Sequence, residues 1–347
     1  MAYTTIDKPT DYFNTVLWTG TGVTDRTVTG VGFQPDWTWI KERSAASGHV
    51  VFDVIRGATK RLFPDAPNAE DTITESLKSF DTDGFTLGTN GQVNENTQTY
   101  VGWNWLADNT SGSSNTDGST TSTVSANTTS GFSIVTYTGT GGNTSVGHGL
   151  GVAPDCMIIK CRSHSGTGWW MYHKDLGATK SIYLHDSQTS FTNSYLQNTA
   201  PTSSVFTLDS TSDTNASGRT IVAYCFANKK GFSRAFSYTG NGSSDGTFVY
   251  LGFKPAWILL RRTDGADYWT IRDNKRDVDN VVTQLLYPNV PDAEATAASN
   301  NYLDIVSNGF KLRATSGQVN ASGGSYIGLA FAENPFVTST GIPCTAR

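Results

Sequence analysis

The chain has 347 residues, of which 25 are basic and 30 are acidic, and aromatic residues make up 12% of it. This length exceeds what one hydrophobic core usually supports, so we expect two or three domains. No segment concentrates Lys and Arg as a phosphate-binding surface does, and no stretch approaches the roughly 18 apolar residues of a membrane span. We therefore expect no nucleic acid partner and no membrane span. The polar N-terminus lacks the blocks of a signal peptide, which predicts synthesis in a cytoplasm.

An aromatic residue followed by a Gly-rich turn occurs three times along the chain. The three copies read WTGTG from Trp18, YTGTG from Tyr137 and YTGNG from Tyr238. In each copy a proline lies 15 residues beyond the first glycine of the turn and opens a strand-like run with a basic residue six positions after the proline. These runs are PDWTWIK from Pro35, PDCMIIK from Pro154 and PAWILLR from Pro255. Such a recurrence predicts a repeated structural unit, and proline is tolerated at the first residue of a strand.

Each copy closes with two more strand-like segments. The first reads GFTL from Gly84, VFTL from Val205 and GFKL from Gly309. The second reads YVGWNWLA from Tyr100, IVAYCFAN from Ile221 and YIGLAFAE from Tyr326. In this last strand bulky apolar residues alternate with small apolar ones, which predicts a central strand covered on both faces.

The three copies predict an all-β fold of three tandem antiparallel β-sandwich domains, of jelly-roll or lectin-like type, with very little helix. The domains are expected at residues 1–107, with a short N-terminal segment 1–11, at 131–229 and at 230–347. Residues 108–130 are rich in Ser, Thr and Asn and contain no aromatic residue, which predicts a flexible linker. Short helical turns are expected near residues 68–80 and 276–287.

No pattern in the sequence has the spacing of a catalytic, cofactor or metal site. The Gly-rich turns do not continue into the Gly-Lys-Ser/Thr of a nucleotide-binding loop, and Gly-x-Ser-x-Gly is absent. The acidic residues form no paired set for glycoside hydrolysis, and the histidines and cysteines do not repeat at metal-ligand spacings. We therefore expect no enzyme activity, no catalytic residues, no cofactor and no metal.

Two aromatic pairs are the candidates for contact with a glycan or a protein partner. They are Trp169 with Trp170 in the second copy and Tyr268 with Trp269 in the third. Because adjacent strand residues face opposite ways, one ring of each pair is expected in the core and the other at the surface. An exposed ring can stack on a sugar or anchor an interface. Burial of both rings in the core or between domains is the alternative that we favour.

Two strings, at Asn215 and Asn320, read as formal glycosylation acceptors. Their fixed position ahead of the last strand predicts turns instead.

The longest strings together resemble a known group of proteins. Copy three contains SYTGNGSSDGTFVYLGFKPAWILLRRTD and NASGGSYIGLAFAENPF, copy one VTGVGFQPDWTWIKERS, and copy two VGHGLGVAPDCMIIK. These strings resemble uncharacterised tandem β-domain repeats in structural and tail-fibre-like proteins of bacteriophages, notably marine phages. The resemblance extends over about nine tenths of the chain. It implies a virion component with a lectin-like or jelly-roll sandwich and no assigned catalytic residues.

The function expected from this resemblance is that of a virion structural protein exposed on the particle, either tail-fibre-like or a capsid decoration, that binds host-surface glycans. A purely architectural cement protein of capsid or tail is the first alternative, and a polysaccharide depolymerase is the second. The expected partners are other virion proteins and a host-surface glycan. Since virion parts occupy symmetric platforms, a homo-oligomer is expected as well. The expected location is the virion, after synthesis in the host bacterial cytoplasm.

Overall fold

The computed structural model describes residues 2–345, and almost all of its regular structure is antiparallel β-strand. The helical elements of these residues are a 3-10 turn, η1 (Pro9–Asp11), and the single-turn helices α1 (Gly91–Asn94) and α2 (Gly317–Asn320). The all-β prediction is therefore confirmed. No helix within residues 2–345 has the length and apolar character needed to cross a bilayer. Residues 1, 346 and 347, at the ends of the first and third predicted domains, lie outside the described residues.

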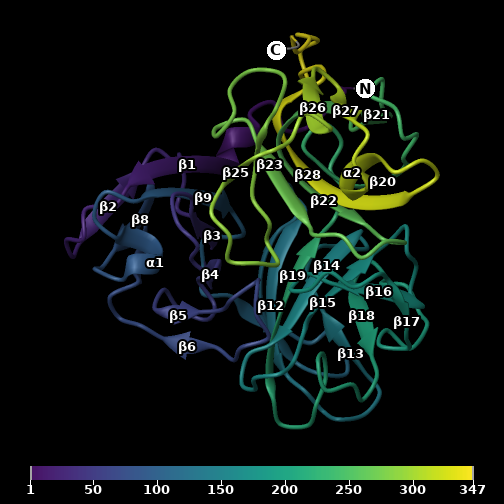
Figure 1. Ribbon diagram of the computed structural model, residues 1–347. Coiled ribbons are helices and arrows are strands. Elements are labelled where there is room, and N and C mark those ends of the chain that lie inside the picture. Colours follow the sequence, from purple (N-terminus) through teal and green to yellow (C-terminus); the bar gives the residue numbers. More distant parts are fainter. Residues whose placement is uncertain (1, 346–347) are drawn as a thin grey trace.

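The strands form three units with the same connectivity, which we name repeat 1 (β1 to β9), repeat 2 (β12 to β19) and repeat 3 (β20 to β28). In Figure 1 repeat 1 lies at the left in purple and blue, repeat 2 at the lower right in teal, and repeat 3 at the upper right in green and yellow. Each has a four-stranded inner sheet. In order across the sheets, the inner strands are β1 (Phe13–Thr19), β9 (Thr99–Trp105), β3 (Trp37–Glu42) and β4 (Val50–Asp53); β12 (Phe132–Thr138), β19 (Thr220–Phe226), β14 (Cys156–Cys161) and β15 (Trp169–His173); and β20 (Ser233–Thr239), β28 (Ser325–Pro335), β22 (Phe253–Arg262) and β23 (Thr270–Asp273).

A smaller outer sheet completes each unit. The outer strands are β2 (Arg26–Thr29), β8 (Gly84–Leu87) and β7 (Leu77–Asp81); β13 (Thr144–Gly147) and β18 (Val205–Leu208); and β21 (Phe248–Tyr250), β27 (Gly309–Ala314) and β26 (Asn301–Val306). Short ribbons are formed by β5 (Lys60–Arg61) with β6 (Asp71–Thr72), β16 (Lys180–Tyr183) with β17 (Phe191–Thr192), and β24 (Gln284–Leu285) with β25 (Ala295–Thr296). In each repeat the outer sheet packs on one face of the inner sheet around a core of its own.

The last strand of each copy, β9, β19 or β28, is central in its inner sheet, as predicted. Its small residues face the repeat's own outer sheet, where space is limited. A Cβ at Gly102, for example, would lie 3.1 Å from the indole of Trp18 and 3.5 Å from the ring of Phe85. Its bulky residues point the other way, into a core that all three repeats share.

This shared core is built from the inward faces of the three inner sheets and is dominated by aromatic rings. Trp37 of repeat 1 stacks on Tyr224 of repeat 2, with ring centroids 4.6 Å apart. Phe331 of repeat 3 stacks on Phe13 of repeat 1 at 5.1 Å and meets Phe226 of repeat 2 edge-on at 5.9 Å. The repeats therefore bury one face of each inner sheet against one another, and they are not independent domains joined only by linkers.

Hydrogen bonds between the repeats close into a ring. An equivalent residue at the start of the fourth inner strand, or directly before it, hydrogen-bonds through its ring nitrogen to a backbone carbonyl of the neighbouring repeat. The three contacts are Trp169 Nε1 to Phe63 O at 2.7 Å, Trp269 Nε1 to Tyr183 O at 2.9 Å and His49 Nε2 to Tyr287 O at 3.1 Å. His49 Nδ1 accepts a hydrogen bond from the indole N–H of Trp39. The proton of the neutral imidazole is therefore on Nε2, which donates to the backbone carbonyl of Tyr287.

A second ring of contacts uses the main chain. The residue that precedes β6, β17 or β25 donates its N–H to the carbonyl of the residue that follows β14, β22 or β3. The contacts are Glu70 N to Arg162 O at 2.8 Å, Ser190 N to Thr263 O at 2.9 Å and Glu294 N to Arg43 O at 2.8 Å. In two of the three cases the Glu carboxylate also forms a two-pronged ion pair with that arginine. Repeat 1 thus contacts repeat 2, repeat 2 contacts repeat 3, and repeat 3 contacts repeat 1.

The carboxylate of Asp53 is fully buried where repeats 1 and 2 meet. It pairs with the buried Arg56 and accepts a hydrogen bond from the Tyr224 hydroxyl of repeat 2 at 2.7 Å. Repeat 3 has the equivalent pair of Asp273 and Arg276, at 2.6 Å, with the indole of Trp103 as the donor from repeat 1. Repeat 2 has His173 and Leu176 at these positions, and His173 Nε2 lies 3.1 Å from the carbonyl of Gly328 in repeat 3. The same site therefore joins each repeat to the next with different chemistry.

Residues 108–130 are not a free linker, which corrects that expectation. They form β10 (Ser113–Asn115) and β11 (Ser122–Asn127), and β11 pairs with the outer edge of β12. With β10 and β11 at this edge and β16 and β17 at the other, the inner sheet of repeat 2 becomes the eight-stranded sheet of the structure. A segment poor in apolar residues can still add to a sheet, because ladder hydrogen bonds need only the backbone.

Both short helices expected near 68–80 and 276–287 are also corrected, since those residues form turns and the strands β6, β7 and β24. The two helical turns lie instead on identical GQVN strings, at α1 and α2. Each ends in a buried asparagine, Asn94 or Asn320, that fixes the Gly-rich turn of its repeat: Asn320 accepts from Asn241 N at 2.9 Å and donates to Ser243 O at 2.9 Å. Asn215 of repeat 2 makes the same contacts. Burial of Asn215 and Asn320 confirms the turn interpretation of the two acceptor strings.

We expect Arg56→Leu to lower the free energy of unfolding by about 3–5 kcal/mol, because it leaves the buried carboxylate of Asp53 without its cation. Urea unfolding measures this change. The double variant Asp53→His/Arg56→Leu, which copies the residues of repeat 2, should recover part of the loss. As a control, Lys8→Ala breaks an ion pair whose side chains are 72% and 48% exposed and should cost less than about 1 kcal/mol. A cost for Arg56→Leu as small as that of the control would contradict the structural role of the pair.

Gly118→Ala should loosen the β10–β11 hairpin, because a Cβ at Gly118 would lie 2.4 Å from the carbonyl oxygen of Ser145 on β13. The backbone on both sides resists the shift, so the hairpin has to move outward. Hydrogen exchange should become faster in residues 113–127 and stay unchanged in β19. Gly142→Ala is the matched control, since nothing lies within 4 Å of its Cβ. Unchanged exchange of β11 in the Gly118 variant would show that the hairpin does not depend on this close approach.

Candidate functional site

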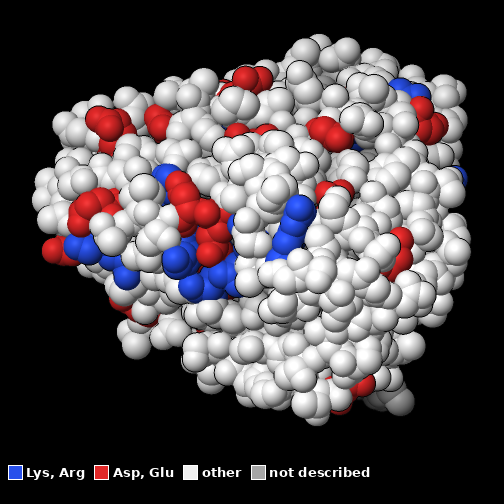
Figure 2. Space-filling model, turned by 90° about the horizontal axis from the view of Figure 1, so that it is seen from below, with Lys and Arg blue, Asp and Glu red and all other residues white. Residues whose placement is uncertain are grey.

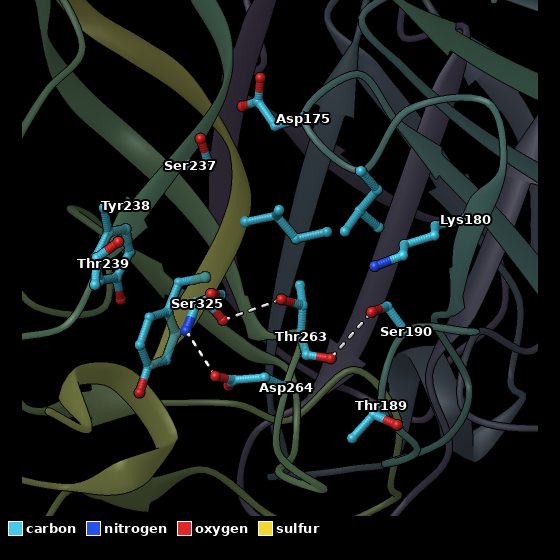
Figure 3. Close-up of a pocket in the computed structure, with 13 residues that line it drawn as sticks. Asp175, Lys180, Thr189, Ser190, Ser237, Tyr238, Thr239, Thr263, Asp264 and Ser325 are labelled. Carbon is cyan, nitrogen blue, oxygen red and sulfur yellow. Dashed lines mark hydrogen bonds between the residues drawn. The ribbon is translucent and has the colours of Figure 1, made fainter. Parts of the chain in front are cut away.

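A cavity of about 560 Å³ lies between repeats 2 and 3, beside the free edge of β20. Its wall is rich in hydroxyl groups: Thr189 and Ser190 come from repeat 2, and Ser237, Thr239, Thr263 and Ser325 come from repeat 3. Asp175 and Lys180 lie on the side of repeat 2, and Lys180 points toward the middle of the cavity (Figure 3). The cavity therefore offers many neutral hydrogen-bonding groups and few charges.

The floor of this cavity is held in place by hydrogen bonds that run from one repeat into the other. The Ser190 hydroxyl donates to the carbonyl of Thr263 at 3.1 Å, and the Thr263 hydroxyl donates to the carbonyl of Ser325 at 3.2 Å (Figure 3). Ser325 N donates to the carboxylate of Asp264 at 3.2 Å. Partial burial opposes ionisation of Asp264, but hydrogen bonds from Arg262 and from Ser325 N hold its pKa below the usual value.

Tyr238 of β20 lines the cavity, and its hydroxyl is not free to react. Its ring stacks on Tyr326 with centroids 4.7 Å apart and planes 6° from parallel, and its hydroxyl donates to the carbonyl of Val319 at 2.6 Å. Burial, reinforced by the neighbouring Tyr326, raises the pKa of Tyr238 well above its usual value. The hydroxyl therefore keeps its proton and serves the packing of repeat 3.

A second cavity, of about 250 Å³, lies next to the first and farther along β20. It shares Asp175, Ser237 and Tyr238 with the first and continues along β20 to Arg234. Its far wall is β21, whose Phe248 and Tyr250 are 45% and 47% exposed. Together the two cavities form an open groove along β20, which we name the β20 groove.

Three of the four aromatic residues predicted to contact a glycan or partner are inaccessible, which corrects that prediction for them. Trp169 and Trp269 are 1% and 0% exposed in the shared core, and Trp170 is buried in the core of repeat 2. Tyr268 is 42% exposed and packs edge-on against Tyr287 at 5.4 Å. The two pairs are also offset by one residue: in the strand register Trp169 matches Trp269, and Tyr268 matches Gly168. The favoured alternative, burial in the core or between repeats, describes Trp169, Trp170 and Trp269.

The residues of the β20 groove were not found from the sequence, because serines and threonines in turns and strand ends carry no chemical signature. One indirect signal was present. The interval between the prolines of copies one and two is longer than that between copies two and three, and the excess is the segment 108–130. Since that segment covers the edge of β12, its absence ahead of β20 leaves the equivalent edge open.

A buried cation lies six positions after the proline of each run: Lys41, Lys160 and Arg261. Burial lowers the pKa of Lys41 and of Lys160 to about 8. A lysine with so low a pKa is often a reactive amine. Here, however, Lys160 Nζ donates to both the carbonyl and the hydroxyl of Thr167, at 2.9 and 3.0 Å, and so fixes the loop after β14. Lys41 Nζ likewise donates to the carbonyl of Ala45, at 3.3 Å, so we assign the two lysines to the support of this loop. Arg261 differs, because it donates to the carbonyl of Gln188 in repeat 2.

The lowered pKa of Lys160 predicts how stability depends on pH. Between about pH 8 and pH 10 the unfolded chain holds the proton that the folded chain has lost, so the free energy of unfolding should rise with pH in this window. Lys160→Met should make this rise smaller, as measured by urea unfolding at about pH 7.5 and pH 9.5. Lys8→Met, at an exposed site, is the control and should keep the slope of the unmodified protein. Equal slopes for all three proteins would contradict the assignment.

Within residues 2–345 no three His, Cys, Asp or Glu side chains come together as ligands for a metal ion. No match to a curated protein was found. A family model described as "Domain of unknown function (DUF7483)" matches residues 8–335, a span that contains all three repeats. The chain therefore belongs to the DUF7483 family.

Proposed function

We propose that the chain is a non-enzymatic structural protein of a bacteriophage virion and that its role is architectural. It acts as one rigid block exposed on the particle, in contact with other virion proteins and with copies of itself. The observation that carries this proposal is the closed ring of equivalent contacts between the three repeats.

The ring supports an architectural role because carboxylates and imidazoles, the side chains that most often act as acids and bases in enzymes, form contacts between the repeats in it. The carboxylates of Asp53 and Asp273 and the imidazoles of His49 and His173 all lie in contacts between repeats. Burial lowers the pKa of His49 well below its ordinary value, so this side chain stays neutral and keeps its hydrogen bonds. Groups held in this way stabilise the arrangement of the repeats instead of facing a substrate.

The ring also resists deformation. Moving one repeat would expose the aromatic face of its inner sheet and leave buried donors without acceptors, both of which are unfavourable. Since each repeat contacts both others, a rotation of one repeat away from the block would break its contacts with the other two. A block of this kind suits a component that must keep its shape under load.

The resemblance of the three copies to tail-fibre-like and other structural repeats of phages supports a location on the virion. The surface is compatible with packing against neighbours: the face in Figure 2 is mostly uncharged, and most of the Lys and Arg side chains on it gather with Asp and Glu in one cluster. The burial of Trp169, Trp170 and Trp269 favours the architectural alternative over glycan binding through those rings.

Gold-labelled antibodies raised against the purified protein should decorate intact, purified phage particles in electron micrographs. Hundreds of copies per particle would indicate a capsid decoration, and a few to a few dozen would indicate a tail component. Particles that carry no label after antibody binding to the isolated protein has been verified would refute the location. Newly formed reducing ends after incubation with host envelope polysaccharide would refute the non-enzymatic role and favour the depolymerase.

A further inference from the structure

We infer that the free edge of β20 binds an extended, hydroxyl-rich segment of a partner polypeptide, which adds to the inner sheet of repeat 3 as an antiparallel strand in the β20 groove. This inference goes beyond the proposed function and does not depend on it, because it names a peptide-binding site whatever assembly contains the chain.

The first argument is that this chain already fills the equivalent edge of repeat 2. There β11 pairs with β12, with Thr123 opposite Thr136 and Ser125 opposite Ile134. By the register of β12 with β19 and of β20 with β28, Thr136 corresponds to Ser237. In repeat 3 no strand of residues 2–345 lies at that edge. The fold therefore contains its own example of the complex that we propose.

The second argument is that the β20 groove is the place that the hairpin occupies in repeat 2. A Cβ at Gly112, next to β10, would lie 3.1 Å from the side chain of Ile55 in repeat 1. Ile55 corresponds to Asp175, which lines the groove in the next repeat along the ring. The hairpin thus lies between repeats 1 and 2 as the β20 groove lies between repeats 2 and 3.

The third argument comes from the hydrogen bonds of the β20 edge. On one side of Ser237, the Asn228 side chain accepts from Ala235 N at 2.6 Å. On the other side, the Thr247 hydroxyl donates to Thr239 O at 2.9 Å. Because outward-facing residues alternate along a strand, the N–H and C=O of Ser237 point to the same edge, and within residues 2–345 no group is bonded to them there. A free pair of this kind, in the middle of an edge protected at both ends, fits strand addition.

The walls of the groove define the occupant. In repeat 2, the residues of β11 that pair with Thr136 and Ile134 of β12 are Thr123 and Ser125, whose side chains are small and carry hydroxyl groups. The β20 groove is also lined by hydroxyl groups. Tyr250 corresponds to Gly147, against which Asn115 of β10 lies in repeat 2. A side chain at that position leaves room for one added strand and not for a hairpin. The occupant is therefore a single extended segment rich in Ser and Thr.

The charge of the groove adds one restriction. Arg234 packs over the ring of Tyr250 at 5.7 Å, and Lys180 points into the cavity (Figure 3). Neither has a carboxylate within ion-pair distance among residues 2–345, and Asp175 is the acidic residue that lines both cavities. These two cations therefore face one shared carboxylate, so the groove disfavours a basic segment. Neutral or acidic hydroxyl-rich segments fit best.

A fluorescein-labelled peptide with the sequence of residues 119–129, which contains β11, is the probe. We expect the intact protein to bind it weakly, at micromolar to millimolar concentration, as measured by fluorescence anisotropy, because a free peptide lacks the high effective concentration of a tethered strand. Ser237→Pro removes the outward N–H and should weaken binding by about tenfold or more. Ser237→Ala keeps the N–H and is the matched control, with unchanged affinity expected.

Hydrogen exchange keeps the test valid if Ser237→Pro lowers the melting temperature. In the unmodified protein, the peptide should slow exchange of the Ser237 amide and leave that of Leu17, on the edge of β1, unchanged. The inference is overturned if the peptide does not bind, if Ser237→Pro binds as well as Ser237→Ala, or if protection appears at Leu17 instead. A neutral oligosaccharide that protects the groove when the peptide does not would show that the site takes saccharides.

Discussion

The structure depends on the burial of the inward faces of the three inner sheets against one another. Each inner sheet is apolar on both sides, and its own outer sheet covers only one of them. A sheet with two apolar faces needs a cover on each. Three such sheets meeting around one centre supply this cover for one another, and rings such as Trp37, Tyr224 and Phe331 fill the space between them. Each repeat therefore has the strand order of a separate unit, but its stability depends on the core that it shares with the other two.

The ring of contacts tolerates sequence change where the main chain forms the bond. Ser190 replaces the glutamate found at this position in the other two repeats, and its N–H still donates to the carbonyl of Thr263. His49 replaces a tryptophan and keeps the bond to a backbone carbonyl, because a neutral imidazole is also an N–H donor. Divergence is thus permitted in the side chain as long as a donor of suitable length remains. This explains how three copies that differ at these positions can close the same ring.

Much of the fold could be predicted from the sequence, but its assembly could not. Alternation in the segment from Tyr100 indicated that both faces of the last strand are covered, and the structure confirms this. Alternation does not say what covers a face, so the sequence favours burial of Trp169 and Trp269 without choosing between a core and an interface. The composition of residues 108–130 predicts a linker because composition reports apolar burial, whereas β11 joins the sheet through the backbone ladder with β12. The sequence does not predict the β20 groove either, because an unpaired strand edge is a property of the backbone and leaves no trace in the composition.

Joining three similar units in one chain has a consequence that three identical subunits could not have. In a symmetric trimer every groove between neighbours would be the same. Here the groove between repeats 1 and 2 is occupied by the β10–β11 hairpin, while the groove between repeats 2 and 3 remains open along β20. The shared core fixes the three units in equivalent positions, and the segments between them are then free to diverge. Rigidity therefore comes from what the repeats have in common, and a directional attachment can come from what distinguishes them.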